Sequence, residues 1–277
     1  MEIMDIIKES FIFPTNNLEK LAIYVVLMFV LGLLAVGFAF SIYLAVESSS
    51  IYWILTAILF IITLVLSLIV TGYQVGIVKS GIDMVDNAPE FDWKNDIVTG
   101  IKMIIANIVY MIIPTIIIAI VALIANVPGN VLQMAQEMSA NSANATAVAN
   151  STSALASVSD TTMAAFGTSI TITALVAFVL FIIFAILLTI AEARLANTGS
   201  LGEALNIPET VRDISRIGVG KVIAVFLLLF IIIAVIQAIL NTLYGLIPPL
   251  AILSIIVTPF LAFVSNRATG LLYSDIA

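Results

Sequence analysis

The residues of this sequence that are best suited to chemistry are a local group of carboxylates around Trp93. The group consists of Asp83, Asp86, Glu90, Asp92 and Asp96. Two or three such carboxylates can bind a divalent cation. Their spacing matches no calcium-binding loop, however, and we interpret the group as a solvated polar face.

Other catalytic chemistry finds little support in the composition. The chain has no cysteine and no histidine, so it lacks a thiolate and the commonest general base and metal ligand. Neither a glycine-rich phosphate loop nor a nucleophile elbow is present. We therefore expect a protein that is not an enzyme and that holds no cofactor and no metal.

The elements that carry these residues are dominated by long apolar runs. Hydrophobic residues make up 62% of the chain and charged residues only 10%. A helix needs about 20 apolar residues to cross a bilayer. The runs that meet or approach this length are 21–46, 51–78, 103–127, 166–191, 222–244 and 246–264. They are apolar on all sides and lack the alternation of barrel strands, which predicts an all-α, polytopic helical membrane protein with six transmembrane helices in a single domain, 1–277.

The basic residues predict the orientation of these helices. All ten Lys and Arg side chains lie before the first run, between the second and third, between the fourth and fifth, or after the sixth. The positive-inside rule therefore predicts that both termini lie in the cytoplasm. We expect the protein to be located in the cell membrane. Acidic residues outnumber basic ones, 17 to 10, which argues against a nucleic-acid partner. The expected partner is the lipid bilayer.

The segments on the cytoplasmic side are expected to contain short interfacial helices. In residues 3–11, Ile and Phe recur at helical spacing, which predicts an amphipathic helix on the membrane surface, a disordered tail being the alternative. Pro89 and Pro208 lie at equivalent positions of the two larger loops and predict helix starts. Gly81 and Gly199 precede them and predict helix ends. The similarity of the loops suggests a weak parallel repeat, although ordinary loops between spans use the same residues.

The segment 128–165 is expected to be a flexible extracytoplasmic loop, mobile or partly helical. It is rich in Ala, Ser, Thr and Asn and has no aromatic residue. Asn144 and Asn150 each begin an N-x-S/T sequence, so both are possible glycosylation sites. Such sequences also arise by chance in an Asn- and Ser-rich stretch.

Polar side chains inside the apolar runs are few and uncharged. We single out Thr63, Asn107, Tyr110 and Gln237 as possible intramembrane polar positions. At 1.5 Å per residue, Asn107 lies roughly 8 Å from the inner end of its run and Gln237 roughly 24 Å, so the two amides cannot share one site. Hydrogen bonding between helices is the interpretation we favour over ligand binding. Arg194, at the inner end of the fourth run, is expected to extend to the membrane interface.

Two glycines in the second run have the spacing of a helix-packing motif. Gly72 and Gly76 form a GxxxG sequence that allows another backbone to approach closely. The neighbouring helix could belong to the same chain, to a second copy or to another membrane protein. A homo-oligomer or a membrane-protein partner is therefore a further possibility.

Several of these stretches resemble a known family. They are Ser10-Phe11 with Pro14, Gly72-Tyr73-Gln74 through Gly81, Ala88-Pro89-Glu90-Phe91-Asp92-Trp93, Gly100-Ile101-Lys102, and Tyr110 to Pro114. Together they resemble the archaeal membrane-protein family of "domain of unknown function 4013". The resemblance covers most of the chain apart from the outer loop. It implies the membrane topology and an archaeal cell membrane, and it supplies no activity.

Three functions are compatible with this sequence. We favour a non-enzymatic scaffold or a membrane-organising or assembly component, because catalytic groups and charged intramembrane residues are missing. The alternative is a small-molecule or lipid transporter or channel, which would need a water-filled path past Thr63, Asn107 and Tyr110. An enzyme acting on lipid head groups would need the carboxylates near Trp93 to bind a metal, and we rank it last.

Overall fold

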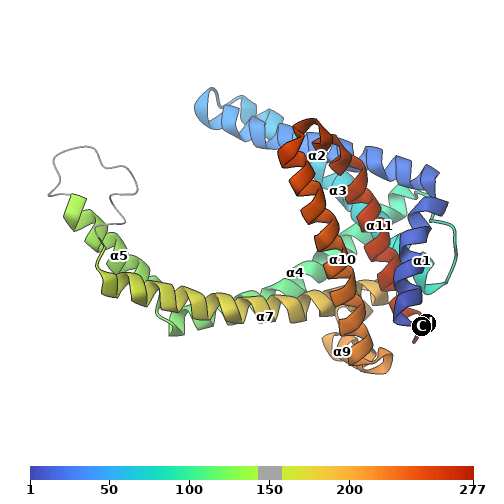
Figure 1. The fold of residues 1–277 in the computed structure, drawn as a ribbon. Coiled ribbons are helices and arrows are strands. Elements are labelled where there is room, and N and C mark those ends of the chain that lie inside the picture. Colours follow the sequence, from blue (N-terminus) through green and yellow to red (C-terminus); the bar gives the residue numbers. More distant parts are fainter. Residues whose placement is uncertain (143–157) are drawn as a thin grey trace. The chain divides into compact units, whose positions relative to one another are not determined.

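The computed structural model describes residues 1–142 and 158–277, and this part of the chain consists of helices without any strand (Figure 1). Six helical segments are long and apolar enough to cross a membrane. They are α2 (Leu18–Glu47), α3 (Tyr52–Ile82), α4 (Trp93–Ile124), α7 (Asp160–Thr198), α10 (Val219–Leu246) and the segment Pro248–Tyr273, formed by the 3-10 helix η1 (Pro248–Leu253) and α11 (Ser254–Tyr273). The predicted fold class, all-helical with six membrane-length helices, is confirmed.

The helices extend beyond the apolar runs that revealed them. α7 has 39 residues, and at 1.5 Å per residue a helix of that length measures roughly 58 Å. The hydrocarbon core of a bilayer is only about 30 Å thick. Backbone hydrogen bonding therefore continues through polar residues at the ends of α7, where hydropathy carries no signal.

Among the described residues, four short helices accompany the long ones: α1 (Ile3–Asn16), α5 (Val127–Ser142), α8 (Leu201–Ala204) and α9 (Ile207–Ile217). The helix predicted from Pro208 is confirmed as α9, which has Asn206 as its N-cap and proline in its first turn. The helix predicted from Pro89 is wrong, because residues 83–92 are not helical. In that loop, side chains of other elements satisfy the backbone: Asn17 Oδ1 accepts from Ala88 N at 2.7 Å, and the Tyr73 hydroxyl lies 3.3 Å from Pro89 O.

The predicted N-terminal helix is present, but its apolar face has a different neighbour from the one expected. Ile6 and Ile7 are buried against protein, at 0% and 6% exposure, and α1 packs along α11. The face of α1 that is exposed carries Met4, Lys8 and Ile12. The expectation that the isoleucines contact the membrane surface is therefore wrong, because periodicity identifies an apolar face and not what covers it.

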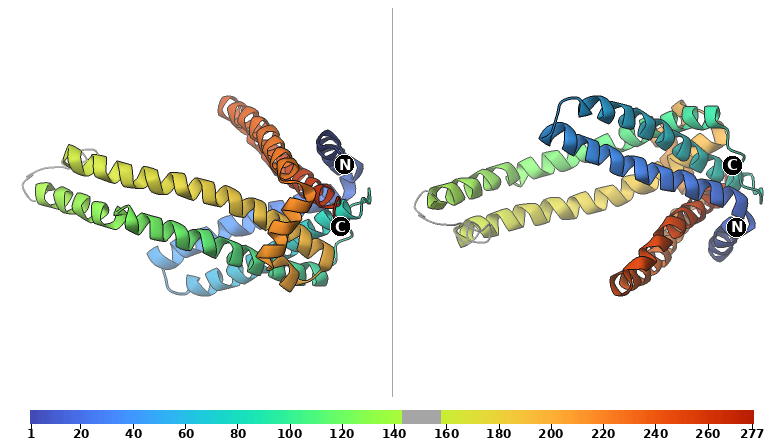
Figure 2. Two further views of the ribbon diagram at one scale, coloured as in Figure 1. Left: turned by 90° about the horizontal axis from the view of Figure 1, so that it is seen from below. Right: turned by 90° about the horizontal axis from the view of Figure 1, so that it is seen from above.

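The chain divides into two compact units. The first contains Met1–Asn107 and Leu187–Ala277, and the second contains Ile108–Ile186. In the first unit, α2 and α3 form one hairpin and α10 and α11 another, and α3 packs against α11 (Figure 2). Both termini lie together in this unit, where Met1 N and Asp275 Oδ1 are 2.9 Å apart.

The packed core of the first unit lies at the helix ends that carry Lys and Arg, which we call the basic end. Aromatic rings dominate it: Tyr73 stacks on Phe91 at a centroid distance of 3.9 Å and on Tyr24 at 5.8 Å, and Phe263 lies 5.2 Å from Tyr24. Away from this end the helices have few contacts with the rest of the protein. In the most apolar 18-residue stretch of α2, only 11% is buried. The chain alone therefore leaves most of this apolar surface for lipid or another protein.

Glycines permit very close helix contacts at the basic end. A Cβ on Gly270 of α11 would lie 2.1 Å from Val78 O and 2.8 Å from the Cα of Gly81 on α3. Gly81 lies in the last turn of α3, which ends at Ile82, so the helix end is close to where it was predicted, and Gly81 also takes part in this helix crossing. Gly199 does end a helix: it follows α7 with φ +66°, a conformation that glycine adopts without strain.

The second unit contains α5 and the first part of α7, which occupy most of the described portion of segment 128–165. Asn130 Nδ2 donates to Ala165 O at 3.2 Å and to Ser169 Oγ at 3.1 Å. Glu137 accepts from the Thr162 hydroxyl at 2.5 Å and from Ser159 N at 2.7 Å, and these hydrogen bonds hold the pKa of the Glu137 carboxyl below its ordinary value. Asn144 and Asn150 lie outside the described residues.

Candidate functional site

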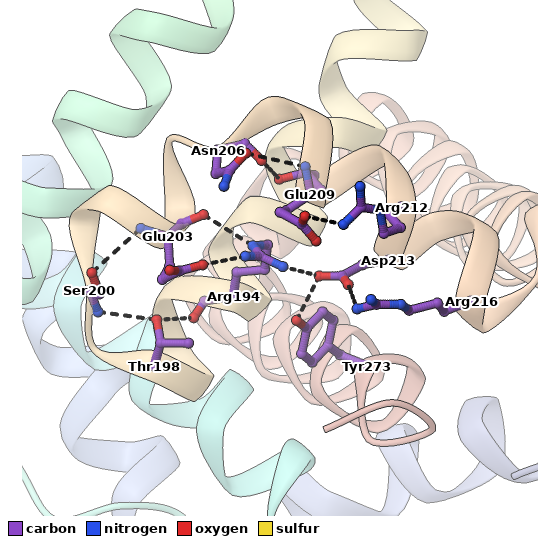
Figure 3. Close-up of polar contacts among 11 residues, drawn as sticks. Arg194, Thr198, Ser200, Glu203, Asn206, Glu209, Arg212, Asp213, Arg216 and Tyr273 are labelled. Atoms are coloured by element: carbon purple, nitrogen blue, oxygen red, sulfur yellow. Dashed lines mark hydrogen bonds and ion pairs between the residues drawn. The ribbon is translucent and has the colours of Figure 1, made fainter.

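The first notable polar cluster is built around Arg194, near the end of α7 (Figure 3). Its side chain is 9% exposed and forms an ion pair with Asp213 of α9, whose side chain is 2% exposed. A second ion pair joins Arg194 Nη2 to Glu203 Oε2 at 2.5 Å, and Nε donates to Glu203 O at 3.0 Å. The Tyr273 hydroxyl of α11 donates to Asp213 Oδ2 at 2.9 Å. One guanidinium thus connects α7, α8, α9 and α11.

Local sequence signals explain how the acids reach Arg194. Ser200 caps α8 by accepting from Glu203 N at 3.4 Å, which fixes the turn after α7. Asn206 caps α9 in the same way, accepting from Glu209 N at 3.3 Å. Asp213 then falls on the buried face of α9, one turn from Ile217. The predicted exposure of Arg194 at the membrane interface is therefore wrong, because its partner comes from a neighbouring helix.

The second cluster surrounds Arg267 of α11, which is 0% exposed. Its Nη1 donates to Ser80 O and Val85 O, both at 2.7 Å, and its Nη2 pairs with Glu9 Oε1 of α1 at 2.5 Å. The guanidinium also lies 4.5 Å from the centre of the Phe13 ring. Three of these four contacts therefore bind α11 to α1 and to the end of α3, and the fourth binds it to the loop after α3.

Asn17, which the sequence did not single out, completes the attachment of α1. Its Nδ2 donates to Phe13 O at 2.9 Å and to Asp86 O at 2.8 Å, while its Oδ1 accepts from Ala88 N. A half-exposed loop is thereby held to the end of α1. A buried asparagine next to the first apolar run is a weak signal, since asparagine at a helix boundary is usually a cap.

A polar cleft of about 340 Å³ opens beside these clusters. It is lined by α3, by the loop before α4, by the first turns of α4 and by the end of α7. The charged residues in its wall are Lys79, Lys102, Glu90, Asp92 and Asp96. Of the carboxylates expected to form a solvated face, Glu90 pairs with Lys20 and Asp83 pairs with Lys79 at 2.9 Å, and both acids remain exposed.

Asp92 and Asp96 cap the first turn of α4. Asp92 Oδ1 accepts from Asn95 N at 3.2 Å, and Asp96 Oδ2 accepts from Asp92 N at 3.1 Å. Carboxylates at this position are favoured by the helix dipole. Asp96 is 6% exposed, so it does not belong to a solvated face. Within residues 1–142 and 158–277 no group of three acidic side chains could hold a metal ion.

The four intramembrane polar positions lie on three different helices. Thr63 is half-buried on α3, and its hydroxyl oxygen has no hydrogen-bond partner among the described residues. Asn107 is exposed on α4, Gln237 is half-buried on α10, and Tyr110 is fully buried in the second unit.

Gly72 and Gly76 both face the loop and first turn of α4. A Cβ on Gly72 would lie 1.9 Å from Asp96 O, and one on Gly76 would lie 3.2 Å from Pro89 Cγ. Within this chain, the glycine pair is thus in contact with α4 and its preceding loop, and both glycines line the polar cleft.

The fold and these clusters define an all-helical protein with six membrane-length helices whose basic ends are joined by buried arginines. The particular family follows from comparison: residues 55–245 match the family described as "Protein of unknown function (DUF4013)", and the chain belongs to it. No curated protein and no solved structure matches the chain.

Proposed function

We propose that this chain is a non-enzymatic integral membrane protein of the cell membrane, with both termini in the cytoplasm, that acts as a scaffold or assembly component. The single observation that supports it most is the use of Arg194 and Arg267. Both buried guanidiniums bond to other elements of the same chain, although Arg267 Nε has no hydrogen-bond partner among the described residues. A transporter usually places such charges along its substrate path.

The apolar helix faces supply the second argument. In the first unit, Val36 and Phe40 of α2 and Phe230 of α10 are each at least 60% exposed. A rigid basic end combined with open apolar faces suits a protein that holds partners laterally within the bilayer. The positive-inside distribution of Lys and Arg supports the orientation.

Cysteine labelling in intact cells tests this proposal, since the chain has no cysteine of its own. Single cysteines replace Thr63, Asn107 or Gln237, and a small water-soluble thiol reagent is added. Lys94→Cys and Asp160→Cys serve as exposed controls for the two sides. We expect only the controls to react, Asp160→Cys from outside and Lys94→Cys only after the membrane is opened. Reaction at Thr63 together with Gln237 would show water deep between the helices and would overturn the scaffold proposal.

A lipid transporter is the second candidate, and one groove favours it. α2 and α11 enclose an apolar space of about 250 Å³ whose wall includes Met28, Gly32, Val36, Thr258 and Pro259. The groove lies along membrane-length helices, where an acyl chain would fill it. Reconstitution into vesicles with a fluorescent lipid tests this candidate: accelerated exchange between leaflets supports it, and a rate equal to that of empty vesicles excludes it.

A further inference from the structure

The polar cleft has unpaired charges of both signs, which sets it apart from the rest of the molecule. Seven of the ten Lys and Arg side chains have a carboxylate oxygen within 4.0 Å: Lys20, Lys79, Arg194, Arg212, Arg216, Lys221 and Arg267. Of the other three, Lys8 and Lys94 are exposed to solvent, whereas Lys102 is half-buried and lines the cleft. Lys102 is thus the one half-buried cation in the described chain that has no acidic partner.

The position of Lys102 is fixed by a single bond. Its Nζ donates to Gly199 O, the carbonyl just beyond α7, at 2.8 Å. The negative end of the helix dipole favours an ammonium there. An ammonium has three hydrogen-bond donors, however, and a carbonyl uses only one. Two donors therefore remain for another group in the cleft.

Two of the three acids of the cleft are unpaired as well, the third, Glu90, being paired with Lys20. Asp92 and Asp96 accept hydrogen bonds from backbone N–H groups of α4, and neither has a Lys or Arg nitrogen within 4.0 Å in the part of the chain that the structure describes. Each carboxylate has about four acceptor positions, so capping leaves capacity for further donors. Lys102 lies six residues beyond Asp96 on α4, roughly 9 Å along the helix axis, so the two charges do not form a direct ion pair.

We propose that this cleft binds a small zwitterion that carries a phosphate and a primary ammonium group, as the phosphoethanolamine headgroup of a membrane lipid does. The phosphate would accept hydrogen bonds from Lys102, and the ammonium would donate to Asp92 and Asp96. This site goes beyond the proposed function and does not depend on it.

Size and depth are consistent with such a headgroup. At about 340 Å³ the cleft lies at the small end of ligand pockets, which measure about 300–1,000 Å³. Lys102 directly precedes the apolar run 103–127, so the cleft lies at the level where lipid headgroups begin. Val75, Leu195 and Ala196 give the wall an apolar part that suits the carbons next to a headgroup.

Trp93 provides a readout, because it immediately follows Asp92 and is 52% exposed. Replacing Trp53, the other tryptophan, by Phe makes the fluorescence report on Trp93 alone. The full chain is placed in phosphatidylcholine nanodiscs, and increasing fractions of phosphatidylethanolamine or phosphatidylglycerol are added. We expect a saturable change with phosphatidylethanolamine only, because choline has no N–H donors and glycerol has no positive charge.

Variants distinguish the site from a general lipid effect. Lys102→Gln removes the cation, and Asp92→Asn removes an anion while keeping a good helix cap. Each loses one charge-assisted hydrogen bond, and we expect apparent binding about tenfold weaker or worse. Lys102→Arg keeps the charge and retains binding. Lys94→Gln is the matched control, since Lys94 lies on the same helix and is exposed, and it should leave the response unchanged.

Soluble phosphoethanolamine identifies the source of the ligand. If it produces the Trp93 response alone, the cleft takes the headgroup from water, and if only the lipid does, the acyl chains are needed. Both results support the assigned chemistry. Equal responses to all three lipids, or a response that survives Lys102→Gln and Asp92→Asn while circular dichroism shows both variants folded, would overturn it.

Discussion

Replacing Arg267 by methionine is the most informative test of how the basic end is held together. The side chain is 0% exposed, and methionine has a similar apolar volume without the donors. The substitution removes the Nη1 donor that bonds the carbonyls of Ser80 and Val85 at 2.7 Å, although Ser80 O still accepts from Val85 N at 2.9 Å. It also removes the ion pair with Glu9.

The expected cost follows from these losses. A buried carbonyl left without its donor costs about 1–3 kcal/mol. Breaking a buried ion pair by removing one partner costs about 3–5 kcal/mol in total. Glu9 is 35% exposed and regains water when its partner is lost, so we expect the lower half of that range, about 3–4 kcal/mol.

Thermal unfolding in detergent or nanodiscs measures this cost, and Arg212→Met is the matched control. Arg212 also pairs with a carboxylate, but its side chain is 59% exposed. Exposed pairs contribute about 0–1 kcal/mol, so the control should unfold almost as the wild type does. A double-mutant cycle with Glu9→Gln isolates the ion pair from the carbonyl contacts. Equal destabilisation by Arg267→Met and Arg212→Met would refute the conclusion that Arg267 holds α11 to α1 and to the end of α3.

Three further changes have defined outcomes. Gly270→Ala should destabilise the protein by about 1–3 kcal/mol through overpacking, whereas Gly32→Ala, with no atom within 4 Å of the added Cβ, should be neutral or stabilising in the same unfolding assay. Tyr273→Phe should cost about 1–2 kcal/mol, because a buried carboxylate loses one donor, and a cost of zero would contradict the cluster around Arg194. Burial raises the pKa of Asp275, but the ammonium groups of Lys221 and the N-terminus outweigh it and hold that pKa below the ordinary 3.8. The stability that this shift provides is present above the ordinary pKa and is lost as the pH falls through the lowered pKa. Proteolysis of the N-terminal helix should therefore accelerate below about pH 4 in the wild type. In Asp275→Asn, lowering the pH should cause no such further acceleration.

The six long helices were predictable because the bilayer imposes a local rule. Each span must satisfy its backbone internally and present apolar side chains, so hydropathy alone identifies it. The helix α9 was predictable for a similar reason, because Asn206 and Pro208 are adjacent in sequence and act on the same helix end.

The arginine clusters could not be predicted, because their partners are distant in the sequence. Arg267 and Glu9 are 258 positions apart, and nothing in either segment specifies the other. One signal for Arg194 was present: on α9, Asp213 shares the buried face with Thr210 and Ile217. A lone acid on an otherwise buried face requires a buried partner, and the nearest Arg before α9 is Arg194.

Glycine gave an ambiguous signal for a physical reason. The same absence of a Cβ allows a left-handed helix end, as at Gly199, and a close backbone crossing, as at Gly81. Only the position of a second backbone distinguishes the two, and for Gly81 that backbone belongs to α11.

The separation of Glu9 from Arg267 also sets an order of events during synthesis. A ribosome adds about 5–20 residues per second, so Glu9 leaves the peptidyl-transferase centre roughly 13–50 s before Arg267 is made. Throughout that interval the first helix can be in place without its ionic partner. A nascent chain that stalls before its last helix therefore has an N-terminal helix that lacks the ion pair between Glu9 and Arg267. A membrane protease can distinguish this helix from that of a completed chain.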